Sequence, residues 1–154
     1  MLVTRKIDYG LRLLMTLGCR SETRLTSVKL AKLIQVPRQF ALKIAQTLTQ
    51  AGMIRAQRGV GGGIELARSP STITLFDIMQ ATDTPRALNA CLLDPKACTR
   101  SIHCAAHQEL RRIQAILDRE LRNVTLADLI SQQKTIDQET KKADFFRQNR
   151  TNHE

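Results

Sequence analysis

Apolar residues recur at helical spacing through the first part of the chain. Ile7, Leu11 and Leu14 follow one another at intervals of three to four, which predicts an amphipathic helix over about residues 5–18. The segment Leu25-Thr26-Ser27 supplies residues that cap helix N-termini. The apolar positions after it therefore predict a short second helix.

A third helix follows after Gln35-Val36-Pro37. Proline pushes the residue before it out of the helical conformation and is itself well suited to the first turn of a new helix. We expect this helix to run to about Gln50 and to stop at Gly52, which can take the left-handed conformation of a helix end. Two helices joined by a tight turn form the arrangement that places the second helix in a major groove of DNA.

Two short apolar segments after the third helix predict a β-hairpin. Residues 53–57 and 64–67 have the character of strands, and Arg58-Gly59-Val60-Gly61-Gly62-Gly63 lies between them. Glycine allows the backbone to turn sharply and to approach another backbone closely. A hairpin in this position predicts a winged helix-turn-helix.

The second half of the chain predicts two short helices and one long one. Thr74-Leu75-Phe76-Asp77 has the spacing of a capping box, so a short helix should run from there to about Ala81. A long helix is expected from about Ser101 to Arg122, and Thr125 should begin a final short helix. The long helix carries an apolar stripe that predicts a dimer seam: Ala106, Leu110, Ile113, Leu117 and Leu121.

These patterns predict a mainly α fold with a small β wing. We expect a winged helix-turn-helix domain over residues 1–82. Residues 83–104 should form a loop that contains Cys91, Cys98 and Cys104, three thiols close enough in sequence to make it a candidate cluster-binding loop. A dimerisation helix and a short C-terminal helix should occupy residues 101–131. Residues 132–154 are polar and are predicted to be a disordered tail.

The charge of the chain favours a polyanionic partner. Its 24 Lys and Arg residues against 14 Asp and Glu give a formal net charge of +10. No apolar run approaches the roughly 20 residues that span a bilayer, and the N-terminus lacks a hydrophobic signal segment. We therefore expect a cytoplasmic protein without a membrane partner, in a compartment where thiols stay reduced.

Three of the four cysteines, together with one histidine, lie within seventeen residues. Cys91, Cys98, Cys104 and His107 have the spacing Cys-x6-Cys-x5-Cys-x2-His. Thiolates and imidazole are suitable ligands for an iron–sulfur cluster or for zinc. Structural zinc usually takes paired Cys-x2-Cys ligands, which are absent here, so the spacing favours a cluster while leaving zinc open. Cys19 lies in the apolar run of the first helix and is explained by core packing.

Several positions on the predicted DNA-reading surface can contact a duplex. Arg38, Gln39 and Lys43 lie near the start of the third helix, where Arg reads guanine and Gln reads adenine. Arg58, beside Gly59 at the predicted tip of the wing, is placed to enter a minor groove. We take these five residues as the candidate DNA contacts.

Three motifs together resemble the Rrf-type winged-helix transcription regulators, which include the iron–sulfur regulators of the IscR and NsrR kinds. They are Asp8-Tyr9-Gly10-Leu11-Arg12, the glycine-rich segment 58–63 and the three clustered cysteines. The likeness covers about residues 1–131. It implies a homodimer in which a loop-bound cluster lies near the DNA-binding domain of the other subunit.

The resemblance leaves the fourth cluster ligand open. His107 resembles the histidine ligand of the IscR-type proteins, and Asp8 resembles the aspartate that NsrR-type proteins contribute from the partner subunit. The segment around Arg38 to Lys43 is more similar to the NsrR branch. An imidazole tends to raise the potential of a cluster, whereas a carboxylate is a poorly matched ligand that is readily displaced.

We therefore expect a homodimeric regulator, a repressor in its simplest form, that binds a pseudo-palindromic duplex. Its [2Fe–2S] or [4Fe–4S] cluster would sense nitric oxide, redox stress or iron–sulfur status. A cluster-free regulator that depends on thiols or zinc is the alternative, and an iron–sulfur electron carrier is a weaker one. An enzyme is not expected, because the chain lacks a recognisable nucleophile triad, phosphate loop or carboxylate pair.

Overall fold

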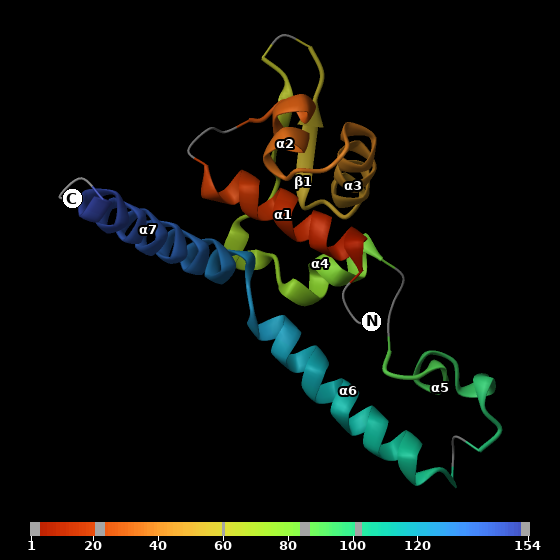
Figure 1. Cartoon of the computed structure of the whole chain (residues 1–154). Coiled ribbons are helices and arrows are strands. Elements are labelled where there is room, and N and C mark those ends of the chain that lie inside the picture. Colours follow the sequence, from red (N-terminus) through yellow and green to blue (C-terminus); the bar gives the residue numbers. More distant parts are fainter. Residues whose placement is uncertain (1–3, 21–23, 60, 84–86, 101–102, 152–154) are drawn as a thin grey trace.

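The computed structural model describes residues 4–20, 24–59, 61–83, 87–100 and 103–151, with the backbone alone for 95 and 141–151. Figure 1 shows a compact body formed by the first helices and a small sheet, from which two long helices lead away. In chain order the elements are α1 (Arg5–Cys19), α2 (Ser27–Leu33), α3 (Arg38–Gln50), β1 (Ile54–Gln57), β2 (Gly63–Leu66), η1 (Pro70–Thr72), α4 (Leu75–Thr82), α5 (Ala90–Leu93), η2 (Pro95–Ala97), α6 (Ala105–Asn123) and α7 (Leu126–Thr151). The predicted mainly α fold with a β wing is confirmed.

The hydrophobic core lies inside the winged-helix body. It is formed by one face of each of α1, α2, α3 and α4, by the two strands, and by the start of α7. Leu13, Leu14 and Leu48 are fully buried at its centre. Each buried leucine contributes about 1.5–3 kcal/mol relative to an exposed one, so this shared core fixes the helices of the body against one another.

Local signals start and stop the helices where the sequence predicts. The Thr26 hydroxyl accepts a hydrogen bond from the Lys29 amide at 3.3 Å and begins α2. Thr74 and Asp77 form the predicted capping box at the start of α4. After α3 the chain turns at Gly52, whose φ of 67° lies in the left-handed region.

The wing contains one more extended segment than the sequence predicts. Strands β1 and β2 pair antiparallel with Ile54 opposite Leu66. Leu25, just before α2, forms a bridge with Ile64 on the other side of β2, through backbone hydrogen bonds of 3.0 and 2.8 Å. The hairpin is therefore anchored to the connection between α1 and α2.

The C-terminal segment differs from the prediction. The disordered tail expected over residues 132–154 is wrong for residues 132–151, because α7 continues as a helix to Thr151, while residues 152–154 lie outside the described residues. No glycine or proline interrupts α7, and Gln133 donates to Asp137 one turn later at 2.8 Å. The polar composition of this segment reflects exposure to solvent and does not prevent helix formation.

The long helix also begins later than expected, at Ala105 after the N-cap Cys104. Ser101, where the prediction placed its start, lies outside the described residues. The preceding loop contains the short helix α5 and the 3₁₀ turn η2. In the part of the chain that the structure describes, no helix is both long and apolar enough to span a membrane.

Candidate functional site

The first candidate surface is the exposed face of α3. Ala41, Ile44 and Leu48 are buried on one side of this helix, so the opposite side faces solvent. Arg38, Gln39 and Lys43, the three predicted contacts on this helix, are all exposed there. The turn before α3 includes Gln35, a non-glycine residue with a φ of 56°, and exposed Pro37 at the N-cap.

The same helix also exposes two apolar side chains that are not among the predicted DNA contacts. Phe40 is 56% exposed and Leu42 is 43% exposed. Apolar side chains contact the methyl group of thymine in a major groove, so this pair can add to hydrogen-bonded readout. The sequence contained a signal for this exposure, because Phe40 and Leu42 are apolar residues outside the three-to-four spacing of Ala41, Ile44 and Leu48.

A groove separates α3 from the wing and has a volume of about 730 Å³. Gln46 and Gln50 of α3 line one side, and Gln57 and Arg58 of the hairpin line the other. Gln46 was not selected from the sequence, although it lies one turn beyond Lys43 on the exposed side of the helix. Amide and guanidinium donors suit nucleic-acid oxygens.

The tip of the wing carries the other two predicted contacts. Arg58 is exposed, and Gly59 follows it with a φ of 96°, a conformation that favours glycine. The Gly62 amide donates to the Gly59 carbonyl at 3.0 Å and closes the loop. Val60 lies outside the described residues.

The second candidate site is a cavity of about 200 Å³ at the start of α6. Cys91 reaches it from α5, Cys98 from the residue after η2, and Cys104 from the N-cap of α6. His107 lines the same cavity from the first turn of α6, one turn after Cys104. All four predicted donors are half-buried. The structure thus brings together the three thiols and the imidazole that the sequence spacing selected.

One contact between these donors joins the two ends of the loop. His107 Nδ1 lies 3.3 Å from Cys91 Sγ, across sixteen residues of sequence. Among the residues that the structure describes, no three His, Cys, Asp or Glu side chains converge closely enough to hold a single metal ion. A cluster offers different iron atoms to different thiolates, so donors spread around a cavity fit that chemistry.

Asp8 is not among the residues that line the cavity. It lies in the first turn of α1, and its carboxylate forms an ion pair with Arg12 at 2.9 Å on the exposed surface. Cys19 is also elsewhere, at the end of α1, packed against the hydrophobic core. Burial raises the pKa of the Cys19 thiol, which disfavours the thiolate that metal binding needs.

Helix α6 connects the cavity to the winged-helix body. Its first turn carries His107, and near its last turn the Arg122 guanidinium lies 3.5 Å from the centre of the Phe76 ring of α4. Thr74 and Thr125 then form an isolated β-bridge. It is flanked by two backbone hydrogen bonds of 2.8 Å, from the Leu75 amide to the Val124 carbonyl and from the Leu126 amide to the Ile73 carbonyl. At the other end of the loop, the Thr4 hydroxyl donates to Asp83 at 2.6 Å.

The predicted seam of α6 carries no fully buried residue. Ile113 is 44% exposed, and Ala106 is exposed as well, while Leu110, Leu117 and Leu121 are half-buried. Leu110 lines the cysteine cavity. The apolar stripe therefore runs along one face of α6 from the cavity toward the body. Figure 1 shows that α6 projects from this body.

Known proteins are similar to this chain in sequence and in fold. A family model described as "Rrf2: Iron-dependent Transcriptional regulator" matches residues 3–132. "Protein aau3" of Rhizobium meliloti (strain 1021) is 30% identical over 131 residues, which are 84% of this chain and 85% of that protein.

Two similar solved structures have the same fold. CymR, described as the global cysteine regulator of B. subtilis, is 24% identical with a TM-score of 0.66, over 84% of this chain and 95% of its own. IscR of T. potens is 20% identical with a TM-score of 0.62, over 84% of this chain and 86% of its own. The chain belongs to the Rrf2 family of transcriptional regulators. It is accordingly a DNA-binding regulator of transcription and not an enzyme.

Proposed function

Starting from membership of the Rrf2 family, we propose that this chain is a cytoplasmic, homodimeric repressor controlled by an iron–sulfur cluster. A [2Fe–2S] or [4Fe–4S] cluster would report nitric oxide, redox stress or iron–sulfur status. The observation that carries this proposal is the cavity at the start of α6, which is lined by Cys91, Cys98, Cys104 and His107. Three soft thiolate donors and an imidazole form a ligand set for iron–sulfur chemistry.

The three cysteines hold the cluster, and two residues compete for the fourth position. His107 is the candidate within one chain, because it lines the cavity and lies 3.3 Å from Cys91 Sγ. Asp8 is the candidate from the partner subunit, and it would first have to exchange its ion pair with Arg12. When bound, the cluster supplies iron and sulfide centres that react with nitric oxide or oxygen and are lost when iron is scarce.

Dimerisation is assigned to α6. Its apolar stripe includes Ile113, which is 44% exposed in one chain, and it begins beside the cysteine cavity. Pairing of two such helices would bury the stripe and bring two copies of α3 to the half-sites of a pseudo-palindromic operator.

DNA binding is assigned to α3 and the wing. Arg38, Gln39 and Lys43 would read base edges in the major groove, and Arg58 beside Gly59 would enter the minor groove. All five residues are exposed on the winged-helix body. The formal net charge of +10 would add attraction to phosphate.

Control of DNA binding by the cluster requires a physical connection, and α6 supplies it. The helix begins at the N-cap Cys104 and ends at the Arg122–Phe76 contact and the Thr74–Thr125 bridge. The N-cap and His107 would move with the state of the loop, and the far end of the helix is fixed to α4. Gain or loss of the cluster would therefore shift the population between dimer geometries that fit the operator differently.

The first experiment is anaerobic purification followed by visible absorption, iron and acid-labile sulfide analysis, before and after addition of nitric oxide. A coloured protein with matching iron and sulfide, bleached by nitric oxide, is the expected result. A coloured protein that resists nitric oxide would assign the site to sensing of cluster supply. Zinc or no metal in the purified protein would refute the cluster and leave a thiol- or zinc-dependent regulator.

Variants of the donors identify the ligand set. Cys91→Ala, Cys98→Ala and Cys104→Ala should each abolish the cluster absorption, whereas Cys19→Ala, the matched control outside the cavity, should keep it. His107→Ala and Asp8→Ala should differ from each other, and only the variant of the true ligand should change both spectrum and cluster lifetime. A normal spectrum in any of the three cysteine variants would remove that residue from the site.

A further inference from the structure

Glu65 is an acidic residue in a strongly basic part of the chain. It is the only Asp or Glu between Thr23 and Phe76. The same stretch contains these basic residues: Arg24, Lys29, Lys32, Arg38, Lys43, Arg55, Arg58 and Arg68. A carboxylate on a DNA-binding domain repels phosphate and weakens sequence-independent attraction. We therefore expect Glu65 to have a structural role in the wing that offsets this repulsion.

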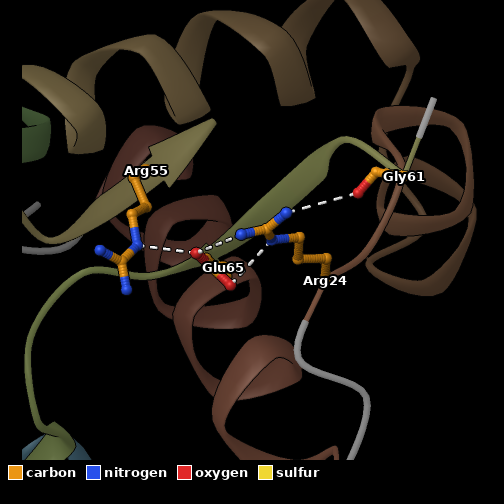
Figure 2. Close-up of polar contacts among 4 residues, drawn as sticks. All are labelled: Arg24, Arg55, Gly61 and Glu65. Carbon is orange, nitrogen blue, oxygen red and sulfur yellow. Dashed lines mark hydrogen bonds and ion pairs between the residues drawn. The ribbon is translucent and has the colours of Figure 1, made fainter. Parts of the chain in front are cut away.

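The structure places Glu65 at the centre of a ladder of alternating charge across the wing. Arg55 is its cross-strand partner on β1, and Arg55 Nε donates to Glu65 Oε1 at 2.7 Å. Arg24 approaches from the other side of β2, where Leu25 pairs with Ile64, and its Nε donates to Glu65 Oε2 at 3.1 Å. Figure 2 shows the carboxylate between the two guanidinium groups.

Arg24 extends the ladder into the loop of the wing. Its Nη1 donates to the Gly61 carbonyl at 3.5 Å, while its Nη2 donates to Glu65 Oε1 at 3.4 Å (Figure 2). One guanidinium group therefore joins the α1–α2 connection, strand β2 and the glycine-rich loop. Gly61 has a φ of 76°, so the loop depends on glycine conformations that are flexible in the absence of such contacts.

The environment of Glu65 keeps its side chain charged and in place. The side chain is 15% exposed, whereas that of Arg55 is 70% exposed. Hydrogen bonds from Arg24 and, to a lesser degree, from Arg55 lower the pKa of Glu65. The carboxylate is therefore ionised at neutral pH and paired on both sides.

We propose that Glu65 is a positioning residue for the wing. It holds Arg24 against Gly61 and thereby fixes the loop that presents Arg58 and Gly59 to the minor groove. Glu65 itself does not contact DNA. This inference rests on the proposed DNA-binding role of α3 and the wing.

The test uses a substitution for which electrostatics and positioning predict opposite signs. A preferred duplex is first selected from a random library with the wild-type dimer, and its affinity is then compared with that of a random duplex over a range of salt concentrations. Glu65→Gln removes one negative charge, so charge alone predicts tighter binding to both duplexes. Positioning predicts that binding to the selected duplex weakens by about tenfold, while the random duplex is bound as tightly as before or more tightly.

Arg24→Gln provides the second variant because it changes the charge in the other direction. It should also lower the preference for the selected duplex, since it breaks the same link to Gly61. Glu139→Gln, at an exposed position of α7 far along the chain, is the matched charge control and should leave the preference unchanged. Thermal unfolding and sedimentation of each variant establish that body and dimer are intact.

The outcomes separate the inference from the function on which it rests. If the wild-type protein selects no sequence, the proposed DNA-reading function fails. If it selects one and Glu65→Gln binds that duplex equally or more tightly, the positioning role is overturned. Loss of preference in both Glu65→Gln and Arg24→Gln, with none in Glu139→Gln, supports the role.

Discussion

The winged-helix body and the arm formed by the cysteine loop and α6 are stabilised in different ways. In the body, one continuous core contains fully buried side chains from every helix and from the sheet. In the described residues between 83 and 125, no side chain is buried. The body carries its own stabilising contacts, whereas the arm gains few from the rest of the chain.

This difference indicates what each region needs in order to keep its structure. Most helices in proteins owe their stability to tertiary packing of an apolar face more than to the helix propensity of their residues. Helix α6 has such an apolar face, with Ile113 and Ile116 exposed. The body is therefore expected to fold as a single chain, and the arm to become ordered through a second subunit and a cluster.

The largest effect on stability should come from the core of the body. Leu48→Ala removes a side chain that is fully buried in α3 and should lower the free energy of unfolding by about 2–5 kcal/mol. Urea denaturation followed by circular dichroism measures the change. Leu93→Ala, at an exposed position of the loop, is the control and should change it little. Equal losses in both variants would remove the distinction between body and arm.

The next effect concerns the arm and its partner. Ile113→Asp places a charge in the apolar stripe and should raise the dissociation constant of the dimer roughly a hundredfold. Ala115→Asp introduces the same charge at another exposed position of α6, away from the stripe, and should leave the dimer intact. Sedimentation equilibrium measures both. A stable dimer of Ile113→Asp would place the subunit contact elsewhere.

A smaller effect is expected where the two regions meet. Arg122→Gln removes the cation–π contact with Phe76 and should lower the free energy of unfolding by about 0.5–1 kcal/mol. Hydrogen exchange at the amides of the last turn of α6 should increase at the same time. Arg119→Gln, one turn earlier and exposed, is the matched control. If these amides exchange equally fast in both variants, the contact between Arg122 and the Phe76 ring does not fix the end of α6.

The smallest effect should be a pH-dependent one at the start of α7. Hydrogen bonds from the Thr125 hydroxyl and then from its amide lower the pKa of Asp128. A lowered pKa means that the carboxylate stabilises the fold above its unfolded-state pKa, and that this contribution is lost as pH falls through the folded pKa. Asp128→Asn should therefore lower the urea concentration at the unfolding midpoint at pH 7 and have less effect on it in strong acid. An equal shift at both pH values would contradict the assignment.

The sequence predicts the body well because its signals are local. Pro37, Gly52 and the Thr74–Asp77 capping box mark helix ends through the conformation or hydrogen bonds of a few neighbouring residues. The prediction ended α7 near residue 131 because the following segment is polar, whereas the helix continues to Thr151. Polar composition indicates exposure, and the helix propensity of the segment after Ile130 is a separate property that decides its structure.

Local sequence signals do not predict contacts between distant parts of the chain. Arg24 and Glu65 are 41 residues apart, and the residues around either of them do not predict their ion pair. The cysteine spacing identifies Cys91, Cys98 and Cys104 as a group but leaves open whether His107 or Asp8 completes it. In the proposed dimer that choice depends on how the two subunits are arranged, which the residue pattern of a single chain does not reveal.

The attachment of α6 at one end has a mechanical consequence. Nineteen residues at 1.5 Å per residue give α6 a length of about 28 Å, and the helix is attached to the body next to the Thr74–Thr125 bridge. A rotation of about 5° at this attachment corresponds to a displacement of about 2.5 Å at the cysteine end of a helix of that length. In the proposed regulator, a displacement of a few ångströms around Cys104 would therefore correspond to a tilt of only a few degrees between α6 and the body.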